Sequence, residues 1–202
     1  STLLELITRL YDVEDGTLLI DNQPIKNKNL HSLRQHIGYV PQDAFLFSDT
    51  ISHNIKFGNA NASQTDIENA AKQAAVHDNI IQFKEGYNTI LGERGISLSG
   101  GQKQRVSIAR ALIKDPAILL FDDCLSAVDT ETEEAILNNL QTATTNKTTL
   151  IVSHRISSAK NADLIIVLEE GRIIQQGTHT TLINQDGYYK DLYEKQLTEK
   201  EI

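Results

Sequence analysis

The apolar residues of this chain fall into short runs and helical stripes, not into long uninterrupted stretches. The first twelve residues carry a stripe of apolar side chains at helical spacing, formed by Leu3, Leu4, Leu6, Ile7 and Leu10. We therefore expect a helix that begins with the first residues. We also expect that the chain starts inside a structural element and belongs to a longer protein.

Six short segments have the pattern of strands: residues 17–20, 36–42, 117–121, 148–153, 163–168 and 171–176. Residues 21–24 between the first two have turn composition. Apolar strands that alternate with helical segments imply a parallel sheet covered by helices on both faces. Ligands of such sheets bind beyond the carboxyl ends of the strands, where Asp122 and His154 stand in this sequence.

The pattern changes between residues 45 and 113, where helices replace the alternation of strands and helices. Residues 63–76 run with alanine-rich helical spacing, and Ser63 precedes Asp66 by three residues, as an N-cap arrangement would. We interpret this block as a helical insertion in an α/β domain.

Composition narrows the class of protein. With 202 residues, 40% apolar content and a net charge of −8, the chain has the composition of an ordinary globular domain and argues against nucleic acid as the main partner. A single cysteine, Cys124, cannot form an internal disulfide, which predicts a reducing, cytosolic setting. The apolar runs are far shorter than the ~20 residues that cross a bilayer.

The segment "ILLFDDCLSAVD" places two carboxylates, Asp122 and Asp123, directly after an apolar strand. A carboxylate at a buried strand tip can hold Mg²⁺, directly or through water, in a nucleotide triphosphate site. The alternative for an isolated aspartate is a helix cap or a surface acid.

The context of these acids is the segment "LSGGQKQR". Gly100 and Gly101 leave bare backbone ahead of a predicted helix, with the hydroxyl of Ser99 beside them. Unpaired N–H groups and the positive end of the helix dipole form an anion site there.

These motifs, in this order, resemble the nucleotide-binding domain of an ABC (ATP-binding cassette) protein over essentially the whole chain. The resemblance implies a P-loop NTPase (RecA-like) fold in a single ABC ATPase domain, with core residues 1–44 and 114–202 and a helical signature subdomain at 45–113. It implies ATP and Mg²⁺ as cofactors.

The resemblance also assigns roles to individual residues. It implies metal contacts for Ser1, Gln42 and Asp122, catalytic roles for Gln42, Asp123 and His154, and nucleotide contacts for Ser1, Thr2, Gln42, Ser99, Gly100, Gly101, Gln102, Asp129 and His154. Ser99 and Gly101 in "LSGGQ" would touch the γ-phosphate of ATP held by the opposite domain. Asp129 belongs to the D-loop and His154 is the switch histidine.

The opening residues resemble the helix that follows the family's phosphate loop. Ser1 would then be a Mg²⁺ ligand and Thr2 the contact to the α-phosphate. We expect that the phosphate loop with its lysine and the preceding strands are missing from this sequence, so that this chain alone binds ATP poorly and is inactive.

The exporter subclass fits best, because "LFSDTISHNIKFG" and "YNTILGERGISLSGGQ" resemble exporter segments. This implies transmembrane domains on the same full-length chain and a place on the cytoplasmic side of the cell's inner membrane. Glu93 stands where exporters contact their coupling helices, although it can equally be an exposed loop acid.

Asp123 departs from the family pattern, which has glutamate after the strand-end aspartate. Aspartate is shorter by roughly 1.5 Å, and a misplacement of about 1 Å can cost on the order of a hundredfold in rate. Asp123 is therefore expected to be a weak base. One reading is the slow-site half of a heterodimer of two such domains; the other is a homodimer in which Asp123 suffices.

Two further functions are compatible with the motifs. One is a soluble ABC ATPase of DNA repair or translation, which usually carries coiled-coil insertions or a second cassette. The other is a regulatory module that binds nucleotide without hydrolysis; Gln42, Ser99 and His154 argue against it, and Asp123 partly for it.

Overall fold

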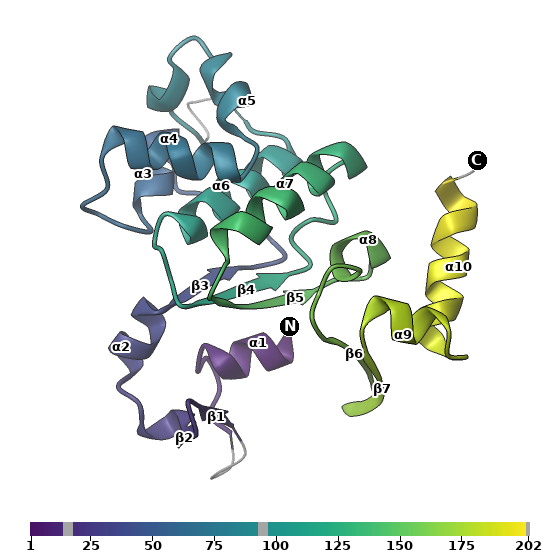
Figure 1. The fold of residues 1–202 in the computed structure, drawn as a ribbon. Coiled ribbons are helices and arrows are strands. Elements are labelled where there is room, and N and C mark those ends of the chain that lie inside the picture. Colours follow the sequence, from purple (N-terminus) through teal and green to yellow (C-terminus); the bar gives the residue numbers. More distant parts are fainter. Residues whose placement is uncertain (14–17, 93–96, 201–202) are drawn as a thin grey trace. The chain divides into compact units, whose positions relative to one another are not determined.

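The computed structural model covers residues 1–202 and describes residues 1–13, 18–92 and 97–200. The chain forms two compact units, Ser1–Val152 and Ser153–Ile202, and each is described by itself. Figure 1 shows their helices and strands.

The first unit is built on a parallel sheet of β3 (Ile37–Val40), β4 (Ile118–Asp122) and β5 (Thr148–Val152), in the order β3-β4-β5. Val40 pairs with Phe121, and Asp122 pairs with Val152. The three strands lie where the apolar runs predict them. Their carboxyl ends meet at one edge, where Asp122 ends β4.

Helices cover both faces of this sheet, as predicted. Leu119 and Phe121 of β4 pack into a core with Val106 and Ile108 of α6 (Gly100–Leu112). Leu120 points the other way, because successive strand residues alternate in direction. It packs against a second core that contains Leu4 of α1 (Thr2–Ile7).

The first helix is shorter than the sequence predicts. It ends at Ile7, and Arg9 adopts a φ of 52° while its N–H donates to the carbonyl of Leu6. Leu3 and Leu10 are 47% and 56% exposed, so the predicted stripe is buried only in part. The spacing does not show this early termination, because the residues that follow still carry apolar side chains.

Between α1 and β3 the chain makes a small hairpin and two short helices: β1 (Leu19–Ile20), β2 (Gln23–Pro24), η1 (Ile25–Asn27) and α2 (Leu30–Gln35). The strands pair antiparallel around Asp21 and Asn22, whose φ values are 54° and 60°. Aspartate and asparagine tolerate this left-handed conformation, so the turn is confirmed at these two residues, whereas Gln23 and Pro24 of the predicted turn form β2.

Further helices of the first unit are α3 (Ile51–Lys56), α4 (Gln64–Gln73), α5 (His77–Ile81), η2 (Gly86–Asn88) and, after β4, α7 (Thr130–Ala143). The predicted cap of α4 is present, since Ser63 accepts from the N–H of Asp66 and the Asp66 carboxylate accepts from the N–H of Ser63. The subdomain boundaries at residues 45 and 113 remain a prediction.

The second unit contains α8 (Ile156–Ala159), β6 (Ile165–Glu169), β7 (Arg172–Gly177), α9 (His179–Ile183) and α10 (Tyr188–Lys200). β6 and β7 pair with each other in antiparallel orientation. Only Glu170 and Gly171 connect them, both at positive φ, and so short a link permits only antiparallel pairing.

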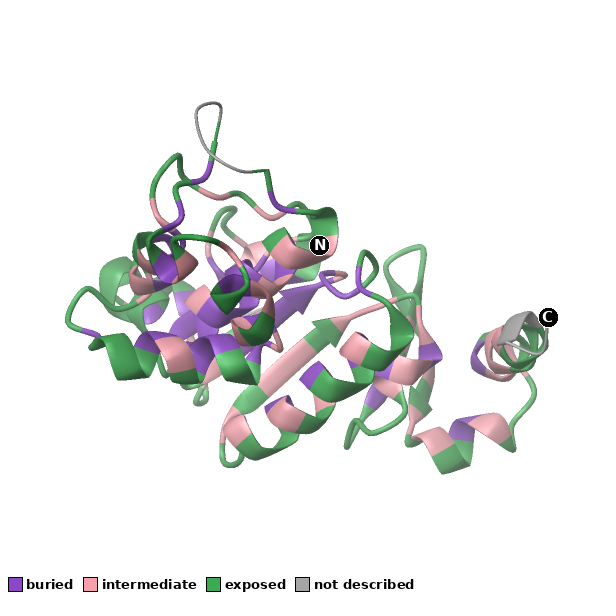
Figure 2. Ribbon diagram, turned by 90° about the horizontal axis from the view of Figure 1, so that it is seen from above, coloured by how far each residue is buried: buried purple, intermediate pink, exposed green. Residues whose placement is uncertain are grey.

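Buried residues are concentrated on β3, β4 and α6, whereas β5 is only partly buried (Figure 2). Among the described residues, no helix has both the length and the apolar character needed to cross a membrane.

Candidate functional site

Asp122, the last residue of β4, is the best-defined polar group at the sheet edge. Asp122 is only 3% exposed. The Ser1 hydroxyl donates to Oδ1 over 3.0 Å, and the Tyr39 hydroxyl donates to Oδ2 over 3.3 Å. Both carboxylate oxygens therefore accept a hydrogen bond, as a buried charge requires.

Tyr39 is a site residue that the sequence analysis did not identify. It stands on β3, the neighbouring strand, and burial followed by the charge of Asp122 raises its pKa to about 12. The sequence offered one signal for it, because Tyr39 lies in a predicted strand three residues before Gln42. Sequence alone does not show that the phenol reaches Asp122, which lies 83 positions away.

Gln42 and Asp123 also meet, with Nε2 of Gln42 lying 3.5 Å from Oδ2 of Asp123. Helix α6 also holds the main chain of Gln42, because Nε2 of the buried Gln104 in α6 donates a hydrogen bond to the Gln42 carbonyl oxygen. This links Gln42 to the helix that Ser99 begins.

The backbone of Asp123 has a φ of 45°, a left-handed conformation that aspartate tolerates better than most side chains. Its N–H donates to the carbonyl of Val152 over 2.9 Å, and its carbonyl accepts from Ser126 Oγ over 2.9 Å. Next to it, Cys124 is buried and burial is the largest cause that raises its thiol pKa to about 12. The thiol is therefore protonated at neutral pH and is not a nucleophile.

The oxygens at this edge suit Mg²⁺. Mg²⁺ is commonly held by one or two protein oxygens while phosphates and water complete its shell, and the Ser1 hydroxyl and the Asp122 carboxylate lie side by side. Within the described ranges, no cluster of three or more His, Cys, Asp or Glu could hold a metal by itself. Gln42, the third expected metal ligand, contacts Asp123.

Ser99 is the N-cap of α6. Its Oγ accepts from the N–H of Gln102 over 3.2 Å, while Oε1 of Gln102 accepts from the N–H of Ser99 over 3.0 Å. This reciprocal capping box fixes the orientation of the Ser99 hydroxyl. Gly101 lies close to the main chain at Ala127, where an added Cβ would come within 3.0 Å of the carbonyl oxygen.

Asp129 has a structural task in this chain as the N-cap of α7. Its carboxylate accepts from the N–H of Thr132 over 2.9 Å, and this hydrogen bond is the main cause that lowers its pKa; Arg105 adds a weaker contribution. Its role in contacting nucleotide stays a prediction.

The remaining predicted residues lie at the ends of elements. Thr2 is the first residue of α1. His154 belongs to the second unit, where its carbonyl oxygen accepts from Nε2 of Gln196 over 2.8 Å. Its contact with a phosphate stays a prediction. Glu93 lies outside the described residues.

An aromatic surface, formed by Phe45, Phe47 and Phe57, follows Gln42 in the first unit. These residues are 66%, 38% and 68% exposed. The Arg110 guanidinium lies 5.5 Å from the ring centroid of Phe47 and 5.9 Å from that of Phe57. It is held by the carbonyls of Asn54 and Phe45, each over 2.8 Å.

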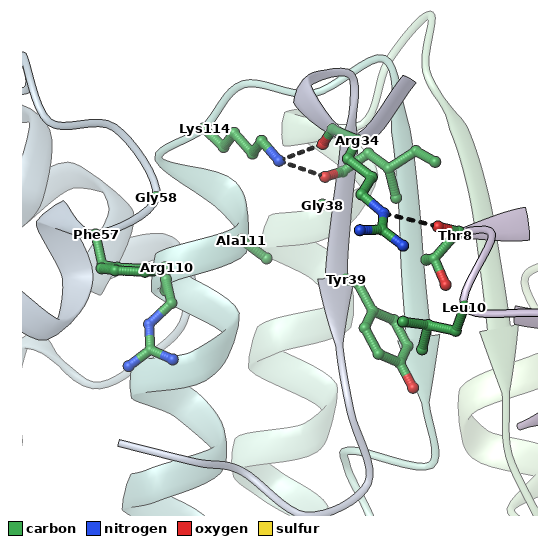
Figure 3. Close-up of a pocket in the computed structure, with 11 residues that line it drawn as sticks. Thr8, Leu10, Arg34, Gly38, Tyr39, Phe57, Gly58, Arg110, Ala111 and Lys114 are labelled. Atoms are coloured by element: carbon green, nitrogen blue, oxygen red, sulfur yellow. Dashed lines mark hydrogen bonds between the residues drawn. The ribbon is translucent and has the colours of Figure 1, made fainter. Parts of the chain in front are cut away.

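A cavity of about 470 Å³ adjoins the aromatic surface at Phe57 and Arg110. Arg34 and Lys114 also line it, and Figure 3 shows Lys114 donating to main-chain oxygens, one of them the Ile37 carbonyl at 2.8 Å. None of its lining residues carries a carboxylate.

Comparison with known proteins agrees with these motifs. A family model described as ABC transporter matches residues 1–126. The chain is 46% identical over 202 residues to "ABC transporter B family member 24, mitochondrial" of Arabidopsis thaliana, covering 100% of this chain and 30% of that protein. It is 47% identical over 200 residues to "Iron-sulfur clusters transporter ATM1, mitochondrial" of Gibberella zeae, covering 98% and 29%.

Among solved structures, the chain resembles one titled "Structure of a bacterial Atm1-family ABC exporter with ATP bound". The TM-score is 0.92 at 45% identity, covering 97% of this chain and 35% of that one. This chain thus spans between about a quarter and a third of the length of the relatives it matches.

Proposed function

The chain belongs to the ABC transporter family, and from this premise we propose that it is the ATP-binding and ATP-hydrolysing domain of an exporter. The observation that carries the proposal is the hydrogen bond from Ser1 Oγ to Asp122 Oδ1, 3.0 Å long, at the carboxyl end of β4. Likeness to an exporter structure with ATP bound supports it.

In this proposal the chain's residues position a magnesium-bound triphosphate for attack by water. Ser1 and Asp122 would hold the metal, which when bound would neutralise the charge that develops on the phosphates. Thr2 contacts the α-phosphate and His154 contacts the γ-phosphate. Gln42 and Asp123, whose side chains meet at 3.5 Å, orient and polarise the water.

A second nucleotide-binding domain is the proposed partner. The capped N-terminus of α6, with Ser99, Gly100, Gly101 and Gln102, would bind the γ-phosphate of ATP held by that partner. Two domains would then close head to tail around two ATP molecules, with the D-loop residue Asp129 at the interface. Closure would drive the membrane domains between their two states.

Asp123 supports a more specific proposal, in which the chain pairs with a different domain and the two ATP sites hydrolyse at unequal rates. Its carboxylate is one methylene shorter than glutamate, and its backbone is fixed through hydrogen bonds to Val152 and Ser126, so main-chain movement does not recover the reach. We therefore assign slow hydrolysis to this chain's own site. Its intact signature would complete an active site on the partner.

Paired substitutions test the unequal pair in the full-length complex. Asp123→Asn should leave ATP turnover within about twofold, whereas changing the partner's catalytic glutamate to glutamine should abolish it. If Asp123→Asn stops turnover, Asp123 is the working base and the homodimer reading holds.

The aromatic surface is the proposed docking site for the transporter's own membrane domain. Exposed Phe45 and Phe57 offer apolar area, while Arg110, Arg34 and Lys114 favour an apolar segment with acidic residues.

A charge at the aromatic surface tests this docking site. Phe57→Asp should lower transport per ATP hydrolysed, and Tyr11→Asp, at a residue 63% exposed, is the matched control. Equal effects of the two substitutions would contradict this assignment.

The proposed side of the membrane follows from where ATP is available. ATP is the substrate, so the domain faces the cytoplasm, or the matrix in an organelle. The inner membrane of a bacterial cell stays a prediction. Because the relatives' names describe transporters, neither the repair or translation ATPase nor the regulatory module is proposed.

The direct test is ATP hydrolysis by the full-length protein in membrane vesicles. We expect hydrolysis that requires Mg²⁺, is lost with EDTA, and accompanies ATP-dependent movement of a solute across the membrane. Hydrolysis without any transport would support a soluble-type ATPase instead.

A further inference from the structure

Tyr39 and Asp122 occupy neighbouring strands on the same face of the sheet. Tyr39 pairs with Leu120 in the parallel register, and Asp122 lies two residues further along β4. Residues two apart on a strand point to the same face. The phenol therefore leans along the strand direction and places its hydroxyl 3.3 Å from Oδ2 of Asp122.

The ring of Tyr39 is held in place by packing. It lies against the cluster that contains Leu4, Ile7 and Leu33, which come from α1 and α2. A half-buried aromatic ring with only two side-chain torsions loses little entropy when it holds one position. Its hydroxyl is thus a fixed donor, not an incidental neighbour.

The two hydroxyl donors divide the carboxylate between them. Ser1 engages Oδ1 and Tyr39 engages Oδ2. The terminal torsion of aspartate is broad and roughly two-fold, so a donor at Oδ2 restrains the rotation of the whole group. Oδ1 then stays turned toward Ser1.

We propose that Tyr39 is a positioning residue for the magnesium-binding carboxylate of Asp122. The proposal rests on the proposed function, since it assumes that Ser1 and Asp122 hold the metal that accompanies ATP. Groups that hydrogen-bond a metal-binding residue typically contribute about 10- to 100-fold to metal affinity.

Tyr39→Phe removes the hydroxyl and keeps the ring, so the cluster beneath it remains packed. We expect the full-length protein carrying this substitution to bind Mn²⁺ about 10- to 100-fold more weakly in the presence of a non-hydrolysable ATP analogue, as measured by electron paramagnetic resonance. Binding of the analogue without metal should stay unchanged.

Tyr11→Phe is the matched control, because Tyr11 is 63% exposed. It should leave Mn²⁺ binding at the unsubstituted value. If Tyr39→Phe also binds Mn²⁺ like the unsubstituted protein, the positioning role is refuted. If the unsubstituted protein binds no Mn²⁺ with the analogue, the proposed function itself fails.

A double-mutant cycle on thermal unfolding without metal provides a second measurement. Tyr39→Phe, Asp122→Asn and the double variant should give non-additive shifts, because the two side chains contact each other. Additive shifts would contradict the contact and remove the basis for the role. A loss of folding in Tyr39→Phe would show as a loss of analogue binding without metal, which would contradict the stated packing.

Discussion

Ser1 Oγ donates a 3.0 Å hydrogen bond to Asp122 Oδ1, although the two residues are 121 positions apart in the chain. The contact joins the start of α1 to the end of β4, two elements that meet only in the folded structure. A hydroxyl and a carboxylate oxygen side by side suit the proposed magnesium-triphosphate site.

Asp122→Asn tests the charge at this contact. The amide keeps the shape of the side chain but loses the negative charge that attracts the metal. We expect binding of Mn²⁺ with a non-hydrolysable ATP analogue at this chain's own site to fall by at least about 10- to 100-fold. Asp186→Asn is the control, because Asp186 is an exposed acid paired with Lys190; a similar loss there would mean that general charge, and not the site, is responsible.

Ser99→Ala separates capping from nucleotide contact. Losing an N-cap of this kind costs about 1 kcal/mol of stability. Ser63→Ala removes the same kind of capping box from α4 and should cost about as much. Only Ser99→Ala should abolish ATP-driven association of the two domains, measured by cross-linking. Equal loss of association in both variants would place the Ser99 effect in helix stability.

Gly101 and Gly100 differ in the room around them. An added Cβ at Gly101 would lie 3.0 Å from the Ala127 carbonyl oxygen, whereas at Gly100 the nearest atom is 3.9 Å away. Gly101→Ala should therefore lower the unfolding temperature. Gly100→Ala should leave it unchanged or raise it by the equivalent of about 0.5 kcal/mol, because alanine favours the helix. The opposite order in calorimetry would contradict this geometry.

Asp129 should make the free energy of unfolding depend on pH in the acidic range. Its hydrogen bond to Thr132 lowers the pKa of Asp129 in the folded state. The stabilisation is therefore present above the unfolded pKa of about 4 and is lost as the pH falls through the folded pKa. Asp129→Asn keeps a capping side chain without the charge. Thermal unfolding at pH 7 and pH 3 should show a smaller acid-induced decrease for this variant than for the unsubstituted protein.

The apolar runs of the sequence predicted the strands of the parallel sheet. The segments of β3 and β4 are apolar because they are buried, and the segment of β5 was found although it is only partly buried. The same patterns did not specify how β6 and β7 pair, since an apolar run does not show whether the strand beside it is parallel or antiparallel. The connection of two residues at Glu170 and Gly171 decided that pairing.

The sequence by itself determined the family and the identity of the polar groups, because the motifs name the residues of the site. The patterns of apolar residues predicted the strands of the sheet. Only the tertiary structure decided which of those groups meet. Ser1 and Tyr39 converge on Asp122 because α1, β3 and β4 pack together, and Gln104 fixes the main chain of Gln42 because α6 lies beside it. Such contacts depend on side-chain direction across separate elements, which the order of residues along one chain does not specify.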